Sequence, residues 1–200
     1  CVIDTLNLWT GGFDYNWYNT TDTSFVIANA EQLAGFGAIV GGMNGQTQDS
    51  FKDKTVKLIC DINLGDKESE NKSNLIFYPI GYTNNAGNYT KVSGGSVTST
   101  VNSFEGTFNG QGHTIANFYQ NTWEMFGDYN DGYSGTPNHY KDAMGLFGYV
   151  NGGTVKNLTV DHFSSDGEFT PTGVIAAYAD GDSTFENIAI TNCNPRVYNT

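Results

Sequence analysis

Short runs of apolar residues, many alternating with polar ones and separated by turns rich in Gly and Asn, recur along most of the chain. The clearest run extends from Lys54 to Leu64, where apolar side chains occupy every second position from Val56 onward. Strict alternation predicts a half-buried β-strand, with Cys60 on its buried side as a small hydrophobe. Two later runs, Gly145 to Val150 and Gly173 to Tyr178, predict further short strands.

Three strand-like stretches align without gaps and form an internal repeat. They begin at Thr114, Thr154 and Thr184, and each reads Thr, apolar, any residue, Asn, apolar. One unit is therefore about 30 residues: a short strand, a Gly-rich turn and a second strand that bends at Asn. The repeated asparagines, predicted to form a structural ladder, are Asn117, Asn157 and Asn187.

Units of this length are too small to bury their own apolar faces, but stacking them does so. Because no helical pattern separates the strands, the sequence predicts an all-β fold, a right-handed parallel β-helix (a solenoid). The repeat alignment predicts that Ile115, Val155 and Phe185 stack along one axis, about 4.8 Å apart. Cys60 and Cys193 would then lie several coils apart, so Cys60 is predicted to be a free thiol.

One helix is predicted near the N-terminus, over residues 29–41. Asn29 can cap it, Gln32 completes a capping box, and Gly41 with Gly42 provides the stop. Gly35 lies inside the helix, which indicates tight packing against a neighbour. An open first coil must be covered, so this helix is predicted to cap the solenoid, with the aromatic residues of positions 9–18 packed beneath it.

The predicted organisation has three parts. Residues 1–50 form an N-terminal segment with the cap helix, residues 51–193 form the coils with an inserted loop at 119–144, and residues 194–200 form a tail or a truncated continuation. The last two repeats are 30 residues apart and the first two 40 apart, which locates the insertion.

Composition narrows the function classes. Aromatic residues make up 14% and charged residues 15%, against about 25% charged in an average domain. The net charge of −12 argues against nucleic-acid and anionic-membrane partners, and no apolar run is long enough for a membrane span.

Abundant Gly, Asn and Tyr with little Lys is typical of an extracellular or cell-surface protein. A signal peptide before Cys1 would make that residue a lipidation site.

Several segments in order resemble a known family: Trp17–Tyr18, Phe25–Gly35, Phe51–Leu58, Asp61–Leu64, Pro79–Gly81, Phe104–Ile115 and Gly145–Gly148. They resemble the right-handed β-helix domain of bacterial surface proteins that carry the GLUG motif, related to filamentous-haemagglutinin-like adhesins. The resemblance covers roughly residues 13–193. It implies a secreted repeat module and offers no catalytic residues to carry over. The charged loop from Asp66 to Lys72 and the long insertion depart from the family pattern.

The inserted loop is the predicted ligand site, because long loops on rigid scaffolds usually carry function. Its aromatic rings and carboxylates suit the stacking and hydrogen bonding of sugars or peptides. The alternative is that the rings only cover the coil. The candidate ligand-binding residues are Trp123, Tyr129, Asp131, Tyr133 and Tyr140.

No cofactor is predicted. Calcium is the alternative, because Asp128–Asp131 and Asp180–Ser183 offer oxygen ligands, although neither completes a twelve-residue calcium loop.

The predicted function is adhesion or display, and the predicted partner is a host or bacterial surface glycan or protein. The alternatives are a structural stalk and a carbohydrate-active β-helix enzyme, a polysaccharide hydrolase or lyase. The carboxylates of such an enzyme would be Asp180, Asp182, Asp128 and Asp131.

Overall fold

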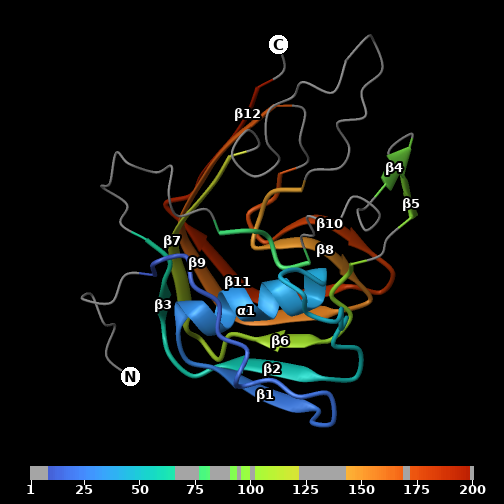
Figure 1. Ribbon diagram of the computed structural model, residues 1–200. Coiled ribbons are helices and arrows are strands. Elements are labelled where there is room, and N and C mark those ends of the chain that lie inside the picture. The colour runs from blue at the N-terminus through green and yellow to red at the C-terminus, as the bar shows by residue number, and fades with distance from the viewer. Residues whose placement is uncertain are drawn as a thin grey trace.

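The computed structural model describes residues 9–65, 77–81, 91–93, 96–99, 102–121, 143–168 and 172–198. It is strand-rich and mostly parallel, with one α-helix in the described part, which confirms the predicted strand-rich class (Figure 1). The elements in chain order are β1 (Ser24–Ile27), α1 (Ala30–Gly41), β2 (Thr55–Leu58), β3 (Ile62–Asn63), β4 (Lys91–Ser93), β5 (Ser96–Ser99), β6 (Thr107–Asn109), β7 (Thr114–Asn121), β8 (Phe147–Asn151), β9 (Thr154–Glu168), β10 (Ala176–Asp180), β11 (Thr184–Thr191) and β12 (Asn194–Tyr198).

The main sheet is built by in-register parallel pairing of segments far apart in sequence. Its order is β1-β2-β6-β9-β7-β3, and β11 and β12 also pair with β9. One column of the register consists of Ser24, Thr55, Thr107, Thr154 and Thr184. The next column holds apolar residues of the same strands, and these are buried in β1, β2, β6 and β9. The repeated Thr-apolar pattern therefore marks equivalent positions of neighbouring strands.

Left-handed residues bend the long strands. Asn157 has a φ of 51° and Asn187, its neighbour in the next strand, has a φ of 52°. A second bend contains Asn117, His162 and Asn192, with φ between 51° and 60°. Asn tolerates this backbone region better than most residues, which explains its recurrence in the sequence.

The predicted stacking of Ile115 on Val155 is wrong. Val155 pairs with Phe185 as predicted, but its other neighbour is Phe108. Ile115 pairs instead with Val160, beyond the first bend. Both bends place a residue in the left-handed region. The sequence motif around Asn117, at the second bend, therefore resembles the motif around Asn157, at the first bend.

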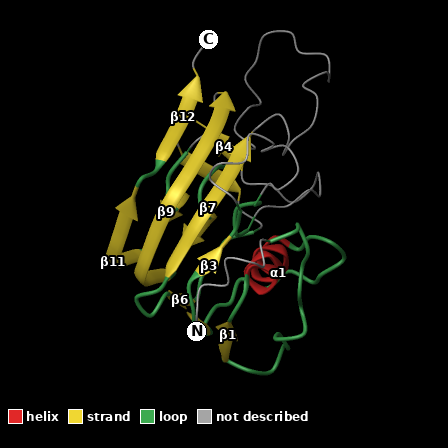
Figure 2. Ribbon diagram, turned by 90° about the vertical axis from the view of Figure 1, so that its left-hand side faces the viewer, coloured by secondary structure: helices red, strands yellow, loops and turns green. Residues whose placement is uncertain are grey.

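Helix α1 forms where the capping residues predicted it. The Asn29 side chain accepts a hydrogen bond from Gln32 N, and Gly42 ends the helix in a left-handed conformation. Ten of its twelve residues are buried, so the helix belongs to the core. The Phe36 ring packs against Phe104 and Phe108, and Figure 2 shows α1 beside the main sheet. No helix of the described residues is long and apolar enough to span a bilayer.

The aromatic residues before β1 pack as predicted, in part. Trp17 lies 5.6 Å from Phe25 of β1 and 6.3 Å from Phe36 of α1, between ring centroids. Tyr18 lies 5.5 Å from Phe25. These two rings therefore cover the Phe25 side chain of the first strand, and Trp17 also contacts the helix.

The remaining predicted segments are placed as follows. The run from Lys54 to Leu64 divides into β2 and β3, with all of its alternating apolar side chains buried. The two later runs overlap β8 and β10, which pair in parallel as a separate sheet. The predicted tail at 194–200 contains β12, which pairs with β9. Cys60 is a free, buried thiol, as predicted.

Candidate functional site

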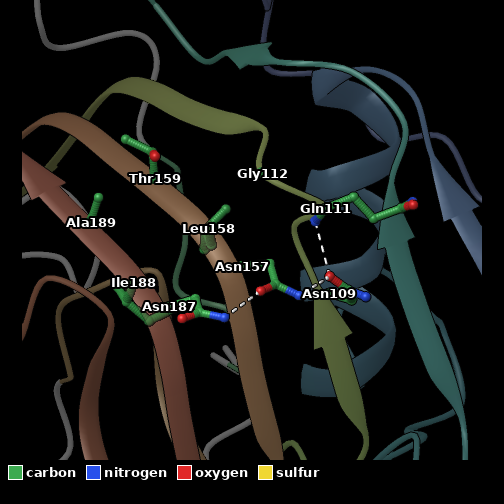
Figure 3. A pocket seen from close by; sticks show the side chains of 9 residues that line it. All are labelled: Asn109, Gln111, Gly112, Asn157, Leu158, Thr159, Asn187, Ile188 and Ala189. Atoms are coloured by element: carbon green, nitrogen blue, oxygen red, sulfur yellow. Dashed lines mark hydrogen bonds between the residues drawn. The ribbon is translucent and has the colours of Figure 1, made fainter.

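An open groove of about 670 Å3 crosses the first bend of three neighbouring strands. It follows the line where β9 and β11 turn at Asn157 and Asn187, and Figure 3 shows the side chains that line it. The lining residues are Asn109, Gln111, Gly112, Asn157, Leu158, Thr159, Asn187, Ile188 and Ala189. None of them carries a formal charge, so the groove suits a neutral ligand. We call this feature the amide groove.

One wall of the amide groove is a longer turn between β6 and β7. Thr107 pairs with Thr154 and Thr114 pairs with Thr159, so this turn is two residues longer than the equivalent bend of β9. Gln111 and Gly112 adopt positive φ of 52° and 82°, which permits the tight reversal. The Gln111 Nε2 atom donates to Leu58 O at 2.7 Å and ties the turn to β2.

The floor of the amide groove is a ladder of side-chain amides. Asn187 Nδ2 donates to Asn157 Oδ1 at 2.9 Å, and Asn157 Nδ2 donates to Asn109 Oδ1 at 3.1 Å (Figure 3). Asn109 Oδ1 also accepts from the backbone N–H of Gln111 at 3.0 Å. These bonds hold the amide planes in place before any ligand arrives, which lowers the entropic cost of binding.

The ladder leaves polar atoms for a ligand at both ends. Every bond runs from a later strand to an earlier one, so Asn109 Nδ2 is available as a donor and Asn187 Oδ1 as an acceptor within the described structure. The Ile188 side chain lies beside these amides and adds apolar surface. The groove therefore combines hydrogen-bonding groups with an apolar patch, as sites for small neutral ligands do.

A second polar cluster lies at the other bend and is structural in character. Asp161 accepts hydrogen bonds from Thr191 Oγ1 at 2.7 Å and Asn192 Nδ2 at 2.8 Å, and it contacts His162 Nδ1 at 2.6 Å. Partial burial raises its pKa, but these hydrogen bonds outweigh that effect and lower the pKa of Asp161 to about 2. The carboxylate fastens the end of β11 to β9.

Asn157 and Asn187 share an amide bond of the predicted kind, whereas Asn117 belongs to a separate amide pair. Asn117 Nδ2 donates to Asn63 Oδ1 at 2.9 Å, at the second bend. The third member of the ladder is Asn109, which sequence reasoning missed. Asn109 follows Thr107 by two positions and not three, so it falls outside the aligned motif.

The other predicted site residues are placed as follows. Asp180 and Asp182 are exposed near the turn between β10 and β11, and Asp180 accepts hydrogen bonds from Gly181 N and Tyr149 OH. The described residues contain no group of three or more His, Cys, Asp or Glu that could hold a metal. The predicted loop residues Trp123, Asp128, Tyr129, Asp131, Tyr133 and Tyr140 lie outside the described residues.

Comparison with known proteins adds no further constraint, since no family model, curated protein or solved structure matches the chain.

Proposed function

We propose that this chain is a binding module of an extracellular or surface protein, with an adhesion or display role. Its scaffold would be a right-handed parallel β-helix. Supporting this architecture, the in-register column from Ser24 to Thr184 links five strands that the chain reaches by successive returns to the same sheet. Parallel strands joined by crossovers are almost always right-handed, which supports the hand.

The amide groove is the proposed binding site, and its uncharged amide ladder is the observation that carries the proposal. Amides donate and accept hydrogen bonds, as sugar hydroxyls do, and strand-to-strand spacing of about 4.8 Å repeats these groups regularly. The apolar Ile188 surface suits the C–H face of a sugar ring. A neutral glycan chain is therefore the proposed ligand class.

The experiment is a neutral-glycan array followed by calorimetry, with two matched variants. Asn109→Asp keeps the Oδ1 acceptor for Asn157 but removes the Nδ2 donor. Asn63→Asp makes the same change where Asn63 Oδ1 accepts from Asn117 at the second bend, outside the groove. We expect Asn109→Asp to weaken glycan binding about tenfold or more, and Asn63→Asp to leave it unchanged.

Two outcomes would count against the proposal. Absence of binding to any neutral glycan would favour a structural stalk. Equal affinity of the two variants and the wild type would remove the amide groove as the site.

A further inference from the structure

β11 is the outermost strand on its side of the main sheet. It pairs in parallel with β9 through residues Thr184 to Thr191. Its opposite edge has no partner strand among the described residues, and Figure 2 shows β11 at the margin of the sheet. An unpaired edge presents backbone N–H and C=O groups that can bind a further strand.

The inner face of β11 is exposed in a way that its neighbours are not. Phe185 is 40% exposed and Ile190 is 51% exposed, whereas Val155 and Val160, their register partners in β9, are fully buried. At the other end of the stack, Phe25 of β1 is only 4% exposed. The first end is covered by the aromatic rings described above, and the β11 end lacks an equivalent cover within the described structure.

The amide ladder has a direction that points beyond β11. Asn187 Nδ2 donates to Asn157 Oδ1, and Asn157 Nδ2 donates to Asn109 Oδ1, so each strand accepts from the following one. Asn187 is the donor of the last ladder bond, and its own Oδ1 accepts from no side chain among the described residues. A further strand with Asn at the same level would complete the bond, at the corner where the backbone already requires a left-handed residue.

The carboxylate of Glu186 constrains a second position of any strand that would pair with β11. Lys156 Nζ lies 3.5 Å from Glu186 Oε1, and the Glu186 side chain is half exposed. A strand paired with the free edge of β11 would place its own third residue beside Glu186, as β9 places Lys156 there. A cation at that position would be favoured over an anion.

We propose that the free edge of β11 binds an extended strand of another polypeptide chain, in parallel and in register, with the sequence pattern Thr, apolar, Lys, Asn, apolar, any, apolar. The backbone edge supplies affinity and the pattern supplies specificity, as in other cases of strand addition. A second copy of this chain is not the proposed partner, because the inner face of its β1 is already covered by Trp17 and Tyr18. This inference rests on the unpaired edge of β11 and not on glycan binding, although the added strand would use the Asn187 Oδ1 atom that also borders the amide groove.

The test uses the whole chain, labelled with nitrogen-15, and a blocked heptapeptide with the sequence of residues 154–160, Thr-Val-Lys-Asn-Leu-Thr-Val. We expect saturable amide shifts confined to β11 and its flanking turns, with a Kd of about 1 mM or tighter, and slower hydrogen exchange along β11. A peptide with Asp in place of Asn and a peptide with Glu in place of Lys should each bind at least about threefold more weakly.

The charge position allows a reciprocal check. Glu186→Lys should weaken binding of the Lys peptide and strengthen binding of the Glu peptide, with unchanged circular dichroism as evidence of folding. The proposal is overturned by no shifts at peptide concentrations of several millimolar, by shifts outside β11, or by equal binding of all three peptides. It is also overturned if the chain self-associates through β11 in sedimentation and Glu186→Lys disrupts that association, since the edge would then serve a second copy.

Discussion

Asn187 donates its side-chain amide to Asn157 Oδ1 at 2.9 Å, and both residues hold a left-handed backbone at the same bend of neighbouring strands. Each asparagine thus has two roles, since its backbone turns the strand and its side chain ties that strand to the next. Substitution with Gly can distinguish the two roles, because Gly adopts the left-handed backbone conformation but has no side-chain amide.

Replacing Asn157 with Ala should destabilise the fold more than replacing it with Gly. Asn157→Ala forfeits both the left-handed preference and the ladder bonds, so we expect a loss of about 2–3 kcal/mol in the free energy of unfolding. Asn157→Gly keeps the backbone freedom and should lose about 1 kcal/mol. Urea denaturation followed by circular dichroism measures both values. Equal losses for the two variants would show that the backbone conformation contributes little.

Two glycines of α1 should respond in opposite ways to the same change. A Cβ on Gly35 would lie 2.1 Å from Asp14 O, a backbone atom that cannot move freely. Gly35→Ala should therefore cost about 2 kcal/mol or more. A Cβ on Gly37 meets ordinary contacts of 3.5 Å and longer, so Gly37→Ala should be neutral or stabilising by up to about 1 kcal/mol. Thermal unfolding of the matched pair distinguishes a close approach from a general helix effect.

The Asp161 cluster predicts a specific acid sensitivity. The folded-state pKa of about 2 lies below the ordinary value of 3.8, so the carboxylate stabilises the fold above about pH 4. That contribution is lost as the pH falls from about 4 to 2. The carboxylate is partly solvent-exposed, so screening limits the effect to about 1 kcal/mol.

Comparing wild type with Asp161→Asn tests this assignment. The variant should be less stable at pH 7 and should lose less stability between pH 4 and pH 2, as measured by urea denaturation at each pH. Parallel pH profiles of the two proteins would show that other groups cause the acid sensitivity.

The thiols should differ in reactivity. Burial raises the pKa of Cys60, and its Sγ donates to Ala28 O at 2.8 Å. Burial also raises the pKa of Cys193, but that side chain is only half-buried. In the native protein at pH 8, iodoacetamide should alkylate Cys193 well before Cys60, because the thiolate must also be accessible. Mass spectrometry of timed digests gives the order, and denatured protein should show no such delay.

The inserted loop remains a competing ligand site. If its aromatic rings bind the glycan, the double variant Trp123→Ala/Tyr133→Ala should lose affinity by about tenfold or more, whereas Asn109→Asp should have no effect. If the amide groove binds the glycan, the pattern should be reversed. Calorimetry with the same glycan on both variants decides between the two sites.

Local sequence alone determined α1 and which side chains are buried in the run from Val56 to Leu64, although the single predicted strand divides into β2 and β3. The helix ends depend on side chains within a few residues of each other, Asn29 with Gln32 at one end and Gly42 at the other. Alternation likewise needs no distant partner, because successive side chains of a strand point to opposite faces. These features were predicted at nearly the right residues for that reason.

Register and the amide groove were decided only by tertiary structure. Ile115 and Val155 follow the same local motif, yet they occupy different columns because both bends accept a left-handed Asn. Asn109 joins the ladder through a turn that is two residues longer than its counterpart in β9. A parallel strand pairs with segments that are dozens of residues away in sequence. The spacing within a motif therefore does not determine which of the two bends the motif will occupy.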